Sequence, residues 1–114
     1  MPISYNFDGG NIDVIEDSNS QNIQLKIRAD ANSSFFQWFY FRVHGLYQVP
    51  CNINIQNAGE ATYPMGFENY DVVYSHDRLN WMRHPTNFIN GILNIEFTPS
   101  QDAVYFAYFA PYSM

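Results

Sequence analysis

The stretch from Phe35 to His44 constrains the fold more than any other part of the chain. Its odd positions carry Phe, Gln, Phe, Phe and Val, whereas its even positions carry Phe, Trp, Tyr, Arg and His. Successive side chains of a strand point to opposite faces of its sheet, so one face of this strand is almost purely apolar. The other face carries aromatic rings with polar tips, which suits a surface that covers or binds something. The stretch therefore predicts a strand that buries one face in a core and partners the other.

Alternation with a period of two recurs along the chain, whereas helical periodicity does not. Apolar and polar residues alternate over 23–28, 51–56 and 93–97. Each of these runs predicts an antiparallel strand with one face toward a core and one toward water. The segment 103–109 is apolar or aromatic at both sets of positions. It therefore predicts a central strand that is covered on both faces.

Turn-forming residues separate these runs at short intervals. Asn90-Gly91 lies between two of them and predicts a tight hairpin that pairs 88–89 with 92–97. About eight to nine short strands at this spacing predict an all-β fold, an antiparallel β-sandwich. A chain of 114 residues is long enough for one core, so residues 1–114 are expected to form a single domain.

Charge and composition exclude several classes of partner. The net charge is −6 and there are only five Lys and Arg residues, so neither nucleic acid nor an anionic membrane is an expected partner. The single Cys51 cannot form an internal disulfide, and the N-terminus lacks the basic start and apolar run of a signal peptide. No stretch approaches the roughly 20 apolar residues of a membrane span. We therefore expect a cytoplasmic protein.

The polar residues do not form a recognisable active site. His44, His76 and His84 lack the spacing of metal-binding motifs, so no metal ligand is expected in this chain. Cys51 opens a strand whose inward positions are apolar, which predicts a buried, inert thiol. His76 and Asp77 are adjacent, but no serine stands out as a nucleophile for them. No catalytic residue is predicted.

Aromatic residues are the remaining candidates for function. Trp38, Tyr40, Trp81, Tyr105 and Tyr108 could line a groove that stacks sugar rings or grips a peptide. They could equally be sandwich core together with the contact face of a neighbouring domain, and rings at strand spacing are more often core. Charged residues make up only 14% of the chain, against roughly 25% in a typical soluble domain, which favours a surface covered by a partner.

A series of sequence blocks covers essentially the whole chain in a fixed order. The blocks are 7–12, 37–43, 52–57, 63–66, 73–75, 81–83 and 102–113. This series resembles the N-terminal domain of the cytosolic carboxypeptidase-like branch of the zinc metallocarboxypeptidases. Gln-Trp-Phe-Tyr-Phe at 37–41 and Val-Tyr-Phe-Ala-Tyr at 104–108 are its most specific parts. One departure is Gly9-Gly10-Asn11, where the family usually has Ser-Gly-Asn.

The resemblance implies an antiparallel sandwich of the nine-strand type that precedes an α/β carboxypeptidase domain. In the family, the zinc ligands and the catalytic glutamate lie in that second domain, beyond the Pro-Tyr-Ser block. This chain alone is therefore expected to be no enzyme and to hold no cofactor, with zinc bound in the absent catalytic domain after residue 114. The parent would be a zinc metallocarboxypeptidase, a hydrolase that removes C-terminal amino acids from peptides or proteins.

The expected role of the chain is to fold and dock its own C-terminal carboxypeptidase domain and to shape the entrance of the substrate cleft. Candidates for the interdomain face or cleft rim are Trp38, Tyr40, Arg42, Trp81, Arg83, Tyr105, Tyr108 and Tyr112. Arg42 and Arg83 could meet carboxylates of the partner domain or of an acidic peptide substrate. Weak self-association is expected when such a face is isolated.

Two other functions remain open. The chain could be a stand-alone β-sandwich module that binds carbohydrate or peptide through its aromatic residues. It could also catalyse a reaction by itself, an interpretation that stoichiometric zinc in the purified chain would revive.

Overall fold

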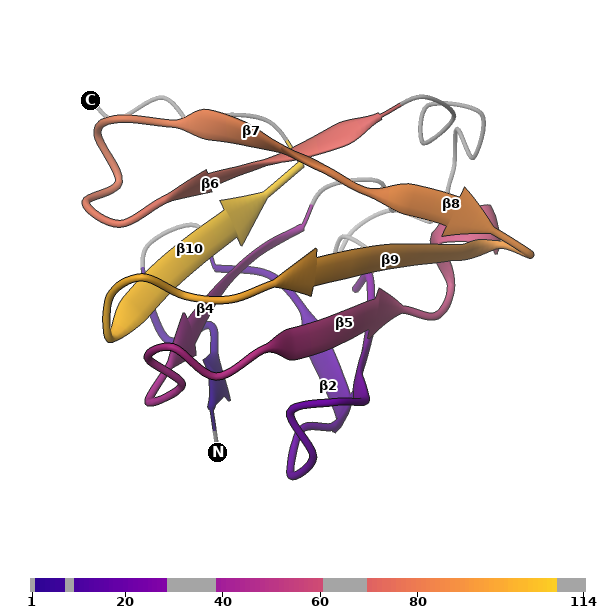
Figure 1. Cartoon of the computed structure of the whole chain (residues 1–114). Coiled ribbons are helices and arrows are strands. Elements are labelled where there is room, and N and C mark those ends of the chain that lie inside the picture. Colours follow the sequence, from indigo (N-terminus) through magenta and orange to yellow (C-terminus); the bar gives the residue numbers. More distant parts are fainter. Residues whose placement is uncertain (1, 8–9, 29–38, 61–69, 109–114) are drawn as a thin grey trace.

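Two five-stranded sheets pack face to face in a computed structural model of the chain (Figure 1). The structure describes residues 2–7, 10–28, 39–60 and 70–108. Sheet A has the strand order β1 (Ile3–Ser4), β4 (Tyr40–His44), β10 (Ala103–Ala107), β6 (Asp71–Ser75) and β7 (Met82–Pro85). Sheet B has the order β2 (Asp13–Glu16), β3 (Ile23–Lys26), β5 (Cys51–Ile55), β9 (Ile92–Phe97) and β8 (Asn87–Ile89). A short 3₁₀ helix, η1 (Ala58–Glu60), follows β5. The predicted all-β sandwich is confirmed.

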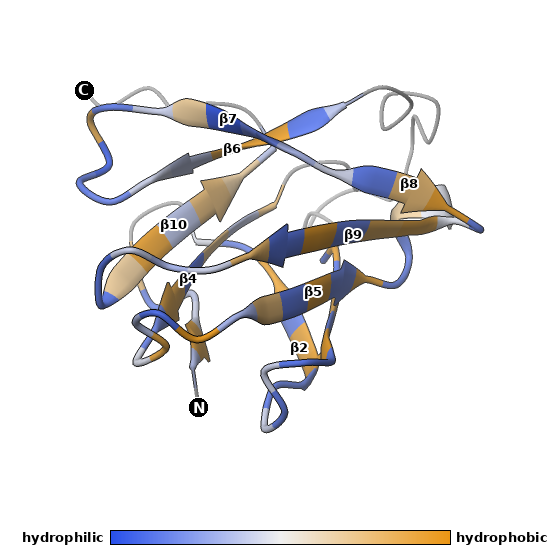
Figure 2. Cartoon of the chain, in the orientation of Figure 1, coloured by the Kyte–Doolittle hydropathy of each residue, from blue (hydrophilic) through white to orange (hydrophobic). Residues whose placement is uncertain are grey.

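The core lies between the sheets, because each strand turns one set of alternate side chains inward. Figure 2 shows the resulting bands of hydrophobic and hydrophilic residues along β5 and β9. Buried side chains of sheet B and sheet A meet in one cluster that includes Ile23, Leu25, Ile53, Ile55, Leu93, Ile95, Phe39, Phe41, Val43, Val104 and Phe106. Fully burying each Leu, Ile or Phe is worth about 1.5–3 kcal/mol, so this cluster is the main stabilising feature of the fold.

Two local predictions are confirmed by the strand pairing. β10 lies at the centre of sheet A, between β4 and β6, as expected for a strand covered on both faces. β8 pairs with β9 across Asn90-Gly91, with Phe88 opposite Leu93. Asn90 and Gly91 have φ angles of 55° and 78°. Positive φ at both central residues is what a type I′ hairpin turn needs, and Asn-Gly tolerates it.

The structure contains ten strands within the described residues, rather than eight to nine. β1 has only two residues, too few for alternation to reveal it in the sequence. β7 and β8 form one ribbon that passes from sheet A to sheet B, and only Thr86 separates them (Figure 1). The part of the Phe35–His44 stretch before Phe39 lies outside the described residues.

One strand pair departs from the antiparallel pattern. β3 pairs with β5 in parallel, with Ile23 opposite Ile53, whereas the other described pairs are antiparallel. The chain leaves β3, contributes β4 to sheet A and then returns to sheet B. Parallel neighbours need a crossover connection, and this excursion through sheet A provides it.

A buried carboxylate links the two sheets where their edge strands β1 and β2 lie. Asp17 follows β2 of sheet B and is 2% exposed. Its Oδ2 accepts a hydrogen bond of 3.2 Å from the backbone amide of Ile3 in β1 of sheet A. β1 is an edge strand, and a side chain that accepts from its backbone leaves that edge less open to pairing with another chain.

Candidate functional site

The outward face of sheet B is a ladder of side-chain amides. Asn94 Nδ2 donates to Asn52 Oδ1, and also to Asn54 Oδ1 at 2.8 Å. Asn54 Nδ2 in turn donates to Asn22 Oδ1 at 3.4 Å. These residues are exposed or half-buried, so the ladder lies at the surface. A face made of small polar amides suits contact with water.

The outward face of sheet A is aromatic instead. Tyr40, Val73 and Ala107 are buried there, and Phe7, Trp81 and Tyr105 pack against them. These six residues are called the outer cluster below. The Phe7 ring contacts Tyr40 and Tyr105 edge-on, with centroids 4.9 and 5.2 Å apart, and Tyr40 contacts Trp81 at 5.9 Å. Edge-to-face contacts at these distances stabilise ring clusters beyond simple burial.

Arg78 lies at the centre of the outer cluster. Its guanidinium carbon is 5.1, 5.6 and 5.3 Å from the ring centroids of Phe7, Tyr40 and Tyr105. Its Nε donates a 2.8 Å hydrogen bond to the hydroxyl of Tyr40. A planar cation stacks on rings while it donates in its own plane, which a lysine ammonium cannot do.

The turn between β6 and β7 holds Arg78 in this position. Arg78 has a φ of 66°, and its backbone amide donates to Ser75 Oγ at 2.8 Å. Asp77 Oδ1 accepts from the amides of Asn80 and Leu79, both at 2.8 Å, and from the Ser75 hydroxyl at 3.0 Å. The hydrogen bonds from the amides of Asn80 and Leu79 are the main reason that the pKa of Asp77 lies below its usual range. The turn is therefore tied together by its own side chains.

Five of the predicted site residues share the outward face of sheet A: Tyr40, Arg42, Trp81, Arg83 and Tyr105. Arg42 lies opposite Tyr105 in the sheet, and Arg83 lies opposite Val73. Directly opposed residues of antiparallel strands point to the same face, so the register places these arginines beside the outer cluster. Arg83 Nη1 donates to the backbone oxygen of Asp71 at 2.9 Å.

Tyr108 lies apart from this group. It packs against the core, with its ring 6.1 Å from Phe39 and 5.3 Å from Tyr70, and its backbone oxygen accepts from the Tyr70 hydroxyl. Trp38 and Tyr112 lie outside the described residues. Phe7 and Arg78 belong to the site but were not among the predicted residues. Alternation finds strand residues only, and Arg78 reaches the sheet from a turn.

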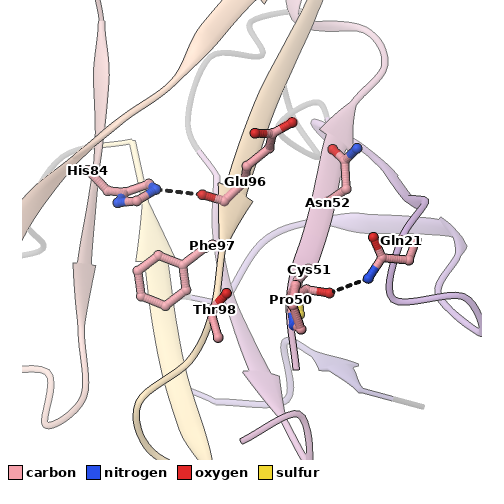
Figure 3. A pocket seen from close by; sticks show the side chains of 8 residues that line it. All are labelled: Gln21, Pro50, Cys51, Asn52, His84, Glu96, Phe97 and Thr98. Carbon is pink, nitrogen blue, oxygen red and sulfur yellow. Dashed lines mark hydrogen bonds between the residues drawn. The ribbon is translucent and has the colours of Figure 1, made fainter. Parts of the chain in front are cut away.

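A pocket of about 590 Å³ opens beside β5 and β9 (Figure 3). It is lined by Gln21, Pro50, Cys51, Asn52, His84, Glu96, Phe97 and Thr98. His84 Nε2 is 2.7 Å from the backbone oxygen of Glu96, and Gln21 donates to the backbone oxygen of Pro50 at 2.8 Å. The side chains of His84 and Gln21 thus contact backbone oxygens and not each other.

Cys51 is in the wall of this pocket, but its side chain is 4% exposed. Burial raises the pKa of its thiol, and Sγ lies 3.2 Å from the backbone oxygen of Val49. A protonated, enclosed thiol is a poor nucleophile, which confirms the predicted buried cysteine.

Two of the three histidines, His76 and His84, contact different parts of the chain. His84 contacts the backbone of Glu96, and His76 Nε2 is 3.4 Å from Ser100 Oγ. Across the described residues, no three His, Cys, Asp or Glu side chains come together in a way that could hold a metal ion. The described part of the chain therefore offers no ligand set for a zinc ion.

The family model described as the cytosolic carboxypeptidase N-terminal domain matches residues 3–109. The chain belongs to this domain family. The match includes β4 and β10, the adjacent central strands that supply Tyr40, Arg42 and Tyr105 to the candidate site. The resemblance inferred from the sequence blocks is confirmed.

Relatives of this domain are much longer than the chain. It is 43% identical over its whole length to an uncharacterized protein of Zymomonas mobilis and covers 30% of that protein. A crystal structure of a metallo-carboxypeptidase from Burkholderia cenocepacia matches 97% of the chain with a TM-score of 0.94 and 44% identity. A metallo-carboxypeptidase from Pseudomonas aeruginosa, in complex with (2-guanidinoethylmercapto)succinic acid, matches 99% with a TM-score of 0.94 and 38% identity. The chain covers 29% and 30% of these two structures.

Among the residues that the structure describes, no helix has the length and apolar character needed to cross a membrane.

Proposed function

We propose that this chain is the non-catalytic N-terminal domain of a zinc metallocarboxypeptidase, which docks the catalytic domain and shapes the entrance of its substrate cleft. One observation carries the proposal. The domain matches less than a third of a metallo-carboxypeptidase structure, at a TM-score of 0.94 and 44% identity. Most of that enzyme consequently lies outside the matched domain and would have to supply the chemistry.

The contrast between the two outward faces supports a docking role. Sheet B presents side-chain amides, whereas sheet A presents the outer cluster with Arg42, Arg78 and Arg83. Tyr, Trp and Arg are the residue types enriched at protein interfaces and at their energetic centres. Interfaces between domains commonly bury on the order of 600–1,500 Å², which one face of a five-stranded sheet can supply. Sheet A is the face that we assign to the catalytic domain.

Zinc and cell location belong to the same proposal. The described part of the chain gathers no set of metal ligands, so we assign zinc to the remainder of the parent enzyme. We place the parent in the cytoplasm, in keeping with the description of the family as cytosolic.

The test compares the complete gene product with residues 1–114 alone. We expect the complete protein to hold about one zinc ion per chain and to release C-terminal amino acids from peptides. We expect residues 1–114 to do neither. Stoichiometric zinc in the isolated chain, together with amino-acid release, would instead show that this chain is itself catalytic.

The alternative function is a stand-alone module that binds carbohydrate or peptide. The pocket in Figure 3 favours it, because the polar residues Gln21, Asn52 and Glu96 line it together with Phe97. Polar groups beside a ring are the usual components of a sugar site. Calorimetric titration of residues 1–114 with glycans and acidic peptides separates the two functions, since a docking domain should bind neither tightly.

A further inference from the structure

Arg42 lies on the outward face of sheet A, beside the outer cluster. It is half-buried, and its Nε is fully enclosed and makes no hydrogen bond in the structure. Its neighbours across the two flanking strands are Ser4 and Tyr105. A buried donor that has left water and found no acceptor destabilises the molecule that contains it. The Nε of Arg42 thus finds no hydrogen-bond acceptor within the described part of the chain.

The surroundings of Arg42 favour a negatively charged acceptor. Arg78 lies over the ring of Tyr105, 5.3 Å from its centroid, and Tyr105 is the cross-strand neighbour of Arg42. Tyr105 therefore has two arginines as neighbours, Arg78 through a ring contact and Arg42 through the strand register. Asp77, in the nearby turn, already accepts hydrogen bonds from the amides of Leu79 and Asn80. No carboxylate within the described part of the chain forms an ion pair with Arg42; the ion pair seen there joins Arg28 and Asp13.

Charge complementarity identifies the chemistry of the partner. The chain carries −6 overall, yet three of its five Lys and Arg residues lie on this one face: Arg42, Arg78 and Arg83. A carboxylate accepts two parallel hydrogen bonds from the fork of a guanidinium, and because the Nε of Arg42 is enclosed, the edge left to donate them is the one formed by its two Nη groups. The adjoining rings of the outer cluster would exclude water from such a pair and so strengthen it.

We propose that Arg42 anchors an Asp or Glu side chain of the protein part that follows this domain, through an ion pair across the interdomain interface. The inference rests on the proposed docking function and adds the residue and the partner chemistry. The relatives extend well beyond this domain, which covers only 29–30% of their length, so a protein of that length has room for such a partner. Arg42 is a positioning residue here, since it acts on the arrangement of the domains.

The first experiment uses the R42K variant of the complete protein and a zero-length carbodiimide. This reagent joins an amine to a carboxylate only where the two are in contact. We expect a cross-linked peptide that connects β4 to an acidic peptide beyond residue 114 of the same chain. Lys26 is an internal control, because it is exposed on sheet B and should give no such product. A β4 peptide that stays unlinked, or that links only to a second copy in an isotope-mixed sample, overturns the proposal.

The second experiment measures proteolytic release of the domain from the complete protein. We expect R42Q to accelerate release about tenfold, because it removes a charge-assisted bidentate contact. R42K should retain part of the protection against proteolytic release, since lysine keeps the positive charge but lacks the paired donors of the guanidinium. The matched variant K26Q removes one positive charge from the opposite sheet and should leave the rate unchanged. Equal release rates for R42Q and K26Q overturn the proposal.

Footprinting of the wild-type complete protein separates this inference from the proposed function. Hydroxyl-radical labelling reports the accessibility of Trp81 and Tyr105 in the outer cluster. Protection of both rings, with an R42Q variant that releases normally, would mean that sheet A docks without Arg42 as an anchor. Full labelling of both rings in the wild type would mean that sheet A does not dock, which overturns the proposed function itself.

Discussion

At the scale of single residues, Tyr40 connects strand β4 to the turn that carries Arg78. Its ring is buried in the outer cluster, 2% exposed, and its hydroxyl accepts from Arg78 Nε at 2.8 Å. The Y40F variant keeps the ring and removes that acceptor. We expect the free energy of unfolding to fall by about 1–3 kcal/mol, because a hydrogen bond to a charged group is lost. Urea denaturation measures this change.

Tyr47 provides the control for that substitution. Its side chain is 53% exposed, so Y47F should change the free energy of unfolding by less than about 0.5 kcal/mol. Similar losses in Y40F and Y47F would mean that the hydroxyl of Tyr40 does not hold Arg78.

The ionisation of Asp77 should make the stability of the β6–β7 turn depend on pH. The hydrogen bonds from Asn80, Leu79 and Ser75 hold its pKa below the ordinary value of 3.8, so the unfolded chain takes up this proton at a higher pH than the folded one. The stabilisation is therefore fully present above that ordinary pKa and is lost as the pH falls below it. In D77N, which has no carboxylate, this acid-dependent part of the loss should be absent.

Urea unfolding of wild type and D77N at about pH 6 and at about pH 3 checks this prediction. The advantage of the wild type over D77N should shrink at the lower pH. An advantage that is equal at both values would show that the turn is not stabilised by the charged carboxylate.

At the scale of elements, the β8–β9 hairpin and η1 meet at two glycines. The amide of Gly59 donates to the backbone oxygen of Gly91 at 2.8 Å, and a Cβ on Gly59 would lie 2.6 Å from Gly91 Cα. G59A must therefore push the hairpin turn away from η1. We expect it to cost about 1–3 kcal/mol, as overpacking against a backbone does. The amides of β8 should also exchange hydrogen faster in G59A, because β8 is the edge strand of sheet B and has only β9 to hold it.

A substitution at Gly45 serves as the control, because it tests the effect of backbone conformation without the steric effect. It has a φ of 76° and open space around its missing Cβ, so G45A should cost only about 1–2 kcal/mol from the left-handed conformation and leave β8 unaffected. If G45A raises exchange in β8 as much as G59A does, the contact between η1 and the hairpin is not the cause.

At the scale of the whole molecule, the sandwich is built with two different outward faces. The amide ladder of sheet B suits water, whereas the outer cluster and the arginines of sheet A suit a protein partner. If zinc is held outside this domain, its removal should affect the activity of the complete protein but not the stability of this domain. A chelator should abolish release of C-terminal amino acids by the complete protein while the unfolding transition of this domain stays unchanged. A domain transition that shifts with chelation would place a metal ion within residues 1–114.

Much of this architecture follows from the sequence alone. Period-two alternation identified the strands at 23–26, 51–55 and 92–97, and Asn90-Gly91 identified the hairpin, because both signals depend on neighbours along the chain. The sequence blocks also identified the domain family. Alternation even separates Tyr105 from Tyr108, since residues three apart in a strand point to opposite faces, although the predicted site contained both.

Only the tertiary structure decided how these strands are combined. β5 lies parallel to β3 across a connection that passes through sheet A, and no local pattern records that crossing. Arg78 enters the outer cluster because a positive φ turns it back onto sheet A, over rings that come from distant parts of the chain. Arg42 was a candidate from the sequence, but its enclosed and unpaired Nε exists only once its neighbouring strands are in place. Local patterns determine strands and their faces, whereas contacts between distant segments determine which side chains find partners.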